Sequence, residues 1–383
     1  MNNSCYLDCA SSTRVLPEVS HTYITALSDY FPNPSAVHAE GKKSFNFLNE
    51  QKEKISEILK IKPEQVIITS GATESNNTVF HQIKNYYKPE DGRVLISQIE
   101  HGSVFNPAQD LAELGYDVRF IRVNKEGTVD LEHFASQLEE PVIFVSTMLV
   151  NNETGIIQPV DKMVEMAKNK YPNLLFHCDA VQGVYPKIWH CLGNVDFFSL
   201  SGHKFHSPKG IGILVHPESY KIKPLLLGGG QQDNRRSGTM KPALTAAFTK
   251  ALEISWQQRR NKIEKLNQAF LEIFAQSLPQ INIKGKTQNR IPWTLNIGFP
   301  GITGSTLRRA LARENIFVSQ SSACSSQNEK MSRILQAMGA NSQWGHIRIS
   351  FSYLHEEKEL TAAAHKIIEC YRKYSLVKTS TDQ

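Results

Sequence analysis

Short apolar runs alternate with amphipathic stretches over residues 65–215. Seven of these runs are rich in β-branched or aromatic residues and end at polar or glycine-rich segments, which is typical of buried strands. They cover residues 65–71, 93–99, 118–123, 142–147, 174–178, 195–200 and 211–215. Helix-like segments lie between several of them, for example residues 160–170 after Pro159. Strands joined through helices predict an α/β fold with a mostly parallel, seven-stranded sheet.

Two longer amphipathic stretches flank this region. The first, residues 38–60, predicts a helix with one apolar face, formed by Phe45, Leu48, Ile55, Ile58 and Leu59. The second begins at Pro242, where a helix tolerates proline, and predicts one long helix to about residue 278 that bridges two domains. The sequence after it predicts a smaller α+β domain. We therefore expect a large domain over residues 16–257 and a small domain built from residues 1–15 and 258–383.

Composition argues against several classes of function but does not identify one. The 383 residues carry a formal net charge of +6, and lysine and arginine do not gather in one basic stretch, so we expect no direct nucleic-acid partner. The longest apolar run, residues 142–150, is far shorter than the ~20 residues of a membrane span. Six cysteines show no zinc-ligand spacing, and the N-terminal residues do not resemble a secretion signal. These features predict a cytoplasmic protein without a membrane partner.

Polar residues follow the predicted strands at the edge where open α/β sheets bind ligands. Gly71 precedes a helix start, His101 follows the second strand, Asp179 the fifth and Lys204 the sixth. Taken singly, each has an ordinary interpretation: a helix cap, a loop residue, a turn cap and a surface lysine. Their occurrence together at successive strand ends calls for one explanation.

Pyridoxal phosphate explains all of them. This cofactor needs a phosphate site, a lysine that forms a Schiff base with its aldehyde, and an acid beside its pyridine nitrogen. Free N–H groups at the helix start after Gly71 suit a phosphate, Lys204 supplies the amine and Asp179 the acid. His101 can stack on the ring, and Gln182 can hydrogen-bond the ring hydroxyl.

Nine segments of the chain resemble the cysteine desulfurases of the class V aminotransferase group, which have the pyridoxal-phosphate-dependent transferase fold type I. The segments follow the family order and span nearly the whole chain: residues 6–19, 33–41, 69–77, 100–104, 150–160, 177–183, 199–212, 228–239 and 321–326. The resemblance implies that Lys204 holds the cofactor, Asp179 pairs with the pyridinium, Gln182 contacts the ring oxygen and His101 stacks on the ring. The phosphate ligands that it implies are Ala72, Thr73, Ser201 and His203.

Further roles follow from the same resemblance. Thr239 matches a phosphate ligand that comes from the neighbouring subunit, which implies a homodimer. Asn152 and Arg348 match contacts to the substrate carboxylate. Cys324, in the polar segment 319–330, matches the catalytic cysteine of the branch with a long, mobile catalytic segment. His101 is the candidate for proton transfer to or from the reacting groups.

The resemblance implies that L-cysteine is converted to L-alanine while Cys324 takes the sulfur as a persulfide. An acceptor protein then receives this sulfur; an iron–sulfur scaffold and a tRNA-thiolation enzyme are both consistent with the sequence. One alternative is a selenocysteine lyase or another β-lyase that uses the same cofactor. A second alternative is a sulfur-relay scaffold without enzymatic activity.

The chain departs from the family pattern at several positions. The N-terminal motif contains Cys9 where the family usually has another residue, and Gln320 precedes the catalytic segment. Residues 352–355 read Ser-Tyr-Leu-His where a Gly-Arg-containing motif is common, and Asp233-Asn234 replace a commoner pair. None of these departures removes a predicted catalytic group.

Overall fold

The computed structural model describes residues 4–258, 262–285, 287–320 and 331–376. A seven-stranded sheet forms its centre, in the order β2-β8-β7-β6-β5-β3-β4. Its strands are β2 (Val66–Thr69), β3 (Arg93–Ser97), β4 (Val118–Ile121), β5 (Val142–Met148), β6 (Leu175–Asp179), β7 (Phe197–Ser201) and β8 (Gly212–Val215). Strand β8 runs antiparallel to both of its neighbours, β2 and β7, and all other neighbouring strands in this sheet are parallel. The predicted mostly parallel sheet is therefore confirmed, and most of its strands are slightly shorter than the apolar runs.

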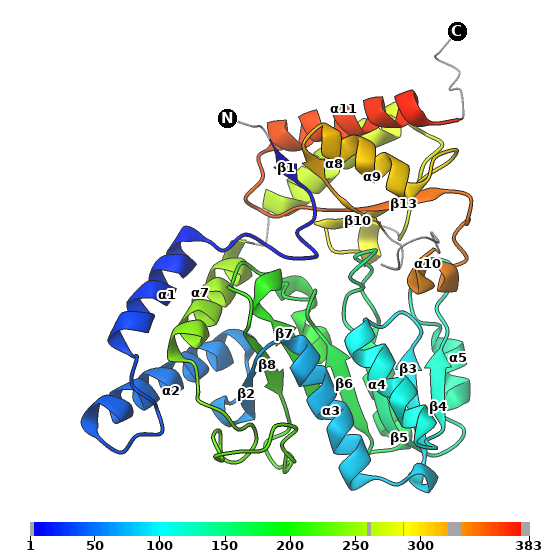
Figure 1. Cartoon of the computed structure of the whole chain (residues 1–383). Coiled ribbons are helices and arrows are strands. Elements are labelled where there is room, and N and C mark those ends of the chain that lie inside the picture. Colours follow the sequence, from blue (N-terminus) through cyan, green and yellow to red (C-terminus); the bar gives the residue numbers. More distant parts are fainter. Residues whose placement is uncertain (1–3, 259–261, 286, 321–330, 377–383) are drawn as a thin grey trace.

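Helices cover both faces of this sheet, and neighbouring strand residues alternate between the two cores. Leu175 and Phe197 belong to the core under α3 (Ala72–Tyr86) and α4 (Gly102–Glu113), which Figure 1 shows in front of the sheet. Phe176 and Phe198 belong to the opposite core. That core receives α5 (Leu131–Gln137), α6 (Val160–Lys170) and the 3-10 helix η3 (Pro186–Leu192).

Helices α1 (Pro17–Asp29), α2 (Ala39–Leu59) and α7 (Pro242–Gln258) pack together at one end of the sheet. Leu48, Ile55 and Leu59 of α2 are buried as predicted. Phe45 is not: its side chain is exposed, so its place in the predicted buried face is wrong. The apolar face of α2 is wider than the surface that α7 covers.

A second layer lies above the large sheet in Figure 1. Its sheet has the order β12-β13-β10-β9, and a parallel pair, β1-β11, lies beside it. The strands are β1 (Cys5–Tyr6), β9 (Asn282–Ile283), β10 (Thr294–Phe299), β11 (Ile316–Phe317), β12 (Ser319–Gln320) and β13 (Gly345–Ser350). The helices are α8 (Lys262–Ser277), α9 (Gly304–Arg313), α10 (Arg333–Ala337) and α11 (Glu357–Tyr374). Short 3-10 helices elsewhere are η1 (Pro63–Gln65), η2 (Pro89–Asp91), η4 (Gly202–Lys204) and η5 (Thr287–Asn289).

Helix covers nearly all of the described part of residues 242–278, where one long helix was expected. Two helices occupy this stretch: α7 packs on α1 and α2, whereas α8 packs on α11 of the second layer. The residues between them, 259–261, lie outside the described part of the chain. Residues 257–262 offer no apolar side chain to a core, so the two apolar faces can pack in different layers.

Among the described residues, no helix combines the length and the apolar character that crossing a membrane requires.

Candidate active site

A cavity of about 560 Å³ opens at the carboxyl ends of the parallel strands. Its lining includes all predicted site residues of the described chain except Thr239: Ala72, Thr73, His101, Asn152, Asp179, Gln182, Ser201, His203, Lys204 and Arg348. Thr239 is exposed and lies outside this lining. Cys324 falls in segment 321–330, outside the described residues. The sheet topology brings most of the other predicted residues together because they lie at or just after the carboxyl ends of β2, β3, β5, β6 and β7, whereas Arg348 comes from β13.

The start of α3 forms one wall of the cavity. Gly71 caps the helix without a side chain, so no cap residue occupies the N–H groups of the first turn. A β-carbon on Gly212 of β8 would lie 2.7 Å from the Gly71 Cα, so two glycines bring the helix start onto the strand. Arg236 donates to Glu74 over 2.8 Å, which ties residues 228–239 to this turn.

Asp179 ends β6 at the floor of the cavity and is buried. Its Oδ2 accepts a hydrogen bond of 3.0 Å from Asn76 Nδ2, and its Oδ1 accepts one of 3.0 Å from the Val181 N–H. Asn76 is completely buried on α3 and also donates to Ser103 Oγ over 2.9 Å. These bonds orient a carboxylate toward the cavity.

Lys204 lies opposite, in η4 after β7. Its Nζ donates to the carbonyl oxygens of Ala10 and Ser11, each at 2.8 Å. Burial, and then the charge of Arg348, lower the pKa of Lys204 to about 8. A fraction of this amine is therefore unprotonated near neutral pH and can act as a nucleophile or base.

His203 and Ser201 stand beside the lysine. The Nδ1 atom of His203 lies 3.3 Å from Ser12 Oγ, and Ser201 is buried at the end of β7. Burial, and then the charges of Lys204 and Lys209, lower the pKa of His203 to about 4. His203 is therefore a neutral imidazole near neutral pH, able to donate one hydrogen bond to a phosphate.

His101 caps the N-terminus of α4. Its Nδ1 accepts the Ser103 N–H over 3.1 Å, so the proton of the neutral ring resides on Nε2. Arg333 of α10 approaches the same strand end: it donates to the carbonyl oxygens of Gln98 and Glu100 and stacks 3.8 Å from the ring centre of Phe105. Arg333 thereby fixes the chain that follows the Cys324 segment next to the strand end that precedes His101.

Arg348 enters the cavity from β13 of the second layer. Its guanidinium donates to Asp8 Oδ1 over 2.8 Å and to Ser11 Oγ over 2.7 Å, and its Nη1 donates to the Asn152 carbonyl over 2.9 Å. The Nε atom of Arg348 has no hydrogen-bond partner among the residues that the structure describes. A buried guanidinium with a donor left over suits a carboxylate ligand.

Gln182 and the N-terminal segment meet at Ala10. The Nε2 of Gln182 donates to the Ala10 carbonyl over 3.0 Å, the same oxygen that accepts from Lys204. Ala10 itself donates its N–H to Ser350 Oγ over 2.8 Å. The N-terminal segment therefore connects the part of the cavity that contains Gln182 and Lys204 to β13.

Sequence reasoning missed Asn76 and Asp8. Asn76 lies four residues after Ala72, which places it on the helix face of the predicted phosphate site, and this spacing was the available signal. The partnership of Asp8 with Arg348 spans 340 residues and has no local sequence signal.

Comparison with known proteins agrees with this geometry. The family model described as Aminotransferase class-V matches residues 5–362. Cysteine desulfurase IscS of Dictyoglomus turgidum is 33% identical over 357 residues, which cover 92% of this chain and 90% of that protein. The NifS/IcsS protein homolog of Lactobacillus delbrueckii subsp. bulgaricus is also 33% identical, over 96% of this chain and 98% of that protein.

Solved structures show the same relationship. A NifS-like protein superposes with a TM-score of 0.87 at 30% identity, covering 96% of this chain and 98% of that one. SspA in complex with cysteine superposes with a TM-score of 0.78 at 28% identity, covering 91% and 99%. The expected transferase fold is therefore confirmed. The chain belongs to the class V aminotransferase family and, within it, to the cysteine desulfurases.

Proposed function

We propose that the protein removes sulfur from L-cysteine, releases L-alanine and passes the sulfur through Cys324 to an acceptor protein. One observation carries the proposal: Lys204, with its lowered pKa, and the buried carboxylate of Asp179 line one cavity together with the guanidinium of Arg348. An amine, an acid and a carboxylate receptor are the groups that pyridoxal-phosphate chemistry on an amino acid requires.

The residues present fit pyridoxal phosphate. The uncapped first turn of α3 suits its phosphate, with Ala72, Thr73, Ser201 and His203 as the proposed ligands. Asp179, held by Asn76, suits a protonated pyridine nitrogen. Gln182 and His101 are the proposed ring contacts, and Lys204 would bind the aldehyde. The bound cofactor supplies an electron-accepting ring that stabilises negative charge at the amino acid Cα.

The other steps fall to the chain's own residues. The Arg348 guanidinium and the side-chain amide N–H of Asn152, both in the cavity lining, orient the L-cysteine carboxylate. Lys204 takes the Cα proton, and its lowered pKa makes it a base near neutral pH. His101 exchanges a proton at Nε2. The Cys324 thiolate attacks the substrate sulfur as the Cβ–S bond breaks; the bonding electron pair stays with the carbon skeleton, which is protonated and leaves as L-alanine, and Cys324 keeps the sulfur as a persulfide.

A homodimer belongs to the same proposal. Thr239 is exposed and outside the cavity lining of its own chain, as expected of a ligand for a partner's phosphate site. Large apolar side chains are exposed on α1, on α2 and between them: Ile24, Leu27, Phe31, Val37 and Phe45. Val37 is 88% exposed and Phe31 79%, which is costly for a surface that stays in water.

The remaining parts of the proposal concern architecture, compartment and acceptor. We assign cofactor binding to residues 16–257 and presentation of Cys324 to the part formed by residues 1–15 and 258–383. The described cysteines are free thiols, which supports a reducing compartment such as the cytoplasm. An iron–sulfur scaffold protein or a tRNA-thiolation enzyme is the proposed acceptor, with no direct nucleic-acid contact and no membrane.

The proposal is tested by incubating purified protein with L-cysteine and quantifying alanine. The wild-type protein is expected to carry the cofactor's visible absorption and to release alanine. Lys204→Ala is expected to lose the covalently held cofactor and the activity, because Lys204 is the amine proposed to bind the aldehyde. Lys170→Ala, a surface lysine paired with Glu139, serves as the control and should retain both. Alanine release by Lys204→Ala at the wild-type rate would refute the proposal.

A further inference from the structure

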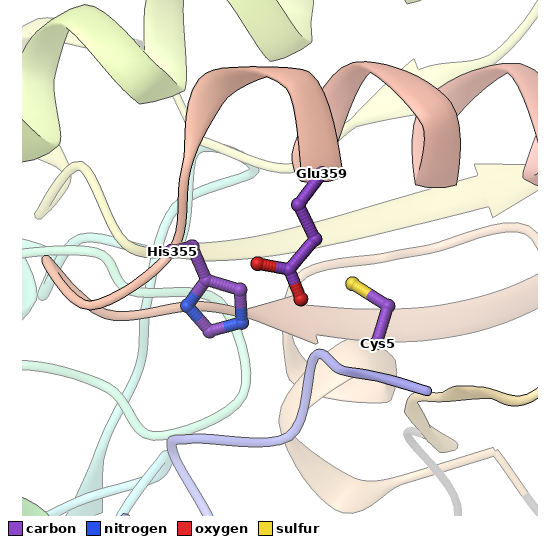
Figure 2. A group of neighbouring side chains, drawn as sticks. All are labelled: Cys5, His355 and Glu359. Carbon is purple, nitrogen blue, oxygen red and sulfur yellow. The ribbon is translucent and has the colours of Figure 1, made fainter. Parts of the chain in front are cut away.

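A second cluster of chemically reactive side chains lies away from the active-site cavity. Cys5 comes from β1, His355 from the turn before α11, and Glu359 from the first turn of α11. One ligand atom from each lies within 4.8 Å of the others, and Figure 2 shows the three side chains converging. Cys5 and His355 are buried, and Glu359 is partly buried.

The orientation of the His355 ring matters for what the cluster can bind. Figure 2 shows Nε2 on the side of the sulfur and the carboxylate, and Nδ1 on the far side. The Ser352 N–H donates to Nδ1 over 3.2 Å, and Nε2 lies 3.0 Å from the Tyr6 carbonyl oxygen, so the proton of the neutral ring resides on Nε2. Binding a cation through Nε2 moves this proton to Nδ1, where the ring can donate to the Ser352 carbonyl oxygen 3.3 Å away. A hydrogen bond donated by the other ring nitrogen commonly orients histidines that bind metals.

We propose that Cys5, His355 and Glu359 form a binding site for a borderline-soft divalent cation of the Zn²⁺ type. Thiolate, imidazole and carboxylate are the three ligand types that zinc prefers in proteins. Hard cations such as Mg²⁺ and Ca²⁺ favour oxygen ligands instead. On binding, Cys5 releases its thiol proton to solvent, and thiolate and carboxylate together neutralise both charges of the cation.

The site has three protein ligands and an open side. A cavity of about 530 Å³ adjoins it and is lined by His355, Glu359 and Cys9 among others. A water molecule from this cavity can complete a tetrahedral shell. Cys9 and His355 are two of the positions at which the chain departs from the family pattern, and the fold brings both to this cavity.

The bound cation would connect the N-terminal strand to α11. The segment that starts at Cys5 continues to Asp8, which holds Arg348, and to Ala10, which accepts from Lys204. Its backbone also pairs with β13: the Ser350 N–H donates to the Leu7 carbonyl over 2.8 Å. The cation would therefore fix the segment that positions both the amine and the guanidinium of the active site.

The test measures metal binding directly, independently of activity. The holoenzyme carrying Cys324→Ser, which removes the other candidate thiolate, is titrated with Co²⁺ and with Zn²⁺ in competition with a chromophoric chelator. We expect one ion per chain and thiolate-to-cobalt charge transfer with d–d bands at longer wavelength than the cofactor. Adding Cys5→Ser should abolish the charge-transfer band. Glu359→Gln, at a partly exposed position that should tolerate it, should weaken affinity at least about tenfold.

A control comes from the other Cys–His–acid group among the described residues. Asp161, His190 and Cys191 also lie close together, but Asp161 and His190 are exposed. Cys191→Ser should leave the titration unchanged. The proposal is overturned if the folded holoenzyme binds neither ion, or if the cobalt spectrum persists with Cys5→Ser and with Glu359→Gln. It is also overturned if Cys191→Ser abolishes the spectrum.

Discussion

Asn76 Nδ2 donates a 3.0 Å hydrogen bond to Asp179 Oδ2, joining the first turns of α3 to the end of β6. The same helix begins at the proposed phosphate site, at Ala72. A single element thus presents backbone N–H groups to one end of the cofactor and orients the acid for the other end. About one helical turn separates Ala72, at the proposed phosphate site, from Asn76, which orients the acid.

Asn76→Ala should therefore weaken cofactor binding. A hydrogen bond to a charged group contributes about 1.5–3 kcal/mol, so we expect cofactor affinity to fall by about ten- to a hundredfold. Equilibrium titration of the apo-protein with pyridoxal phosphate measures this change. Asn85→Ala, on the exposed part of α3 where the Asn85 side chain bonds to His81, is the matched control. Equal affinities of Asn76→Ala and the control would show that Asp179 needs no orientation by Asn76.

The lowered pKa of Lys204 predicts how cofactor uptake depends on pH. Uptake requires the unprotonated amine, so its rate in the apo-protein should rise with pH and level off above about 8. Arg348→Gln removes a positive charge that lowers this pKa, and the midpoint should move to higher pH. Arg348→Lys retains the charge and should keep the midpoint near the wild-type value. Stopped-flow absorbance measures the rates, and an unchanged midpoint in Arg348→Gln would contradict the electrostatic assignment.

Gly212→Ala should affect both stability and cofactor binding. The added β-carbon would lie 2.6 Å from the Leu200 carbonyl oxygen and 2.7 Å from the Gly71 Cα, so either the strand or the helix start must move. Overpacking of this kind destabilises by about 1–3 kcal/mol. Urea unfolding measures the stability and cofactor titration the second effect. Gly193→Ala, where the nearest contact is an ordinary 3.4 Å, should be close to neutral.

Mixed dimers test the position of Thr239. If Thr239 serves the partner's site, a dimer of one Lys204→Ala chain and one Thr239→Ala chain contains one intact site and one doubly altered site. Half of the sites should then bind the cofactor with wild-type affinity, measured on differently tagged, co-purified chains. If Thr239 served its own chain, both sites would be defective, and no wild-type affinity would appear.

Sequence patterns predicted the parts of this protein that local chemistry determines. Each strand of the central sheet is an apolar run bounded by polar residues, and Asp179 and Lys204 follow strand ends, so their convergence could be expected from parallel topology. The contacts of Arg348 with Asp8 and of Asp179 with Asn76 could not, because they join residues far apart in the sequence.

Helical periodicity left the packing partner undetermined at two places. The apolar positions of residues 242–278 keep one helical phase, yet α7 and α8 bury them against different partners. Phe45 has the spacing of a buried residue, yet the described residues leave 43% of it exposed. Periodicity shows which side chains need burial, but not which surface supplies it.

The central claim is that Cys324 takes the sulfur of L-cysteine. The most direct test is to incubate the holoenzyme with ³⁵S-labelled L-cysteine and locate the protein-bound label by peptide mass spectrometry. We expect a persulfide on Cys324, and Cys324→Ser should keep the cofactor's absorption but carry no label. Selenocysteine turnover by Cys324→Ser at the wild-type rate would favour the lyase alternative. Persulfide formation on another cysteine, undiminished in Cys324→Ser, would contradict the account.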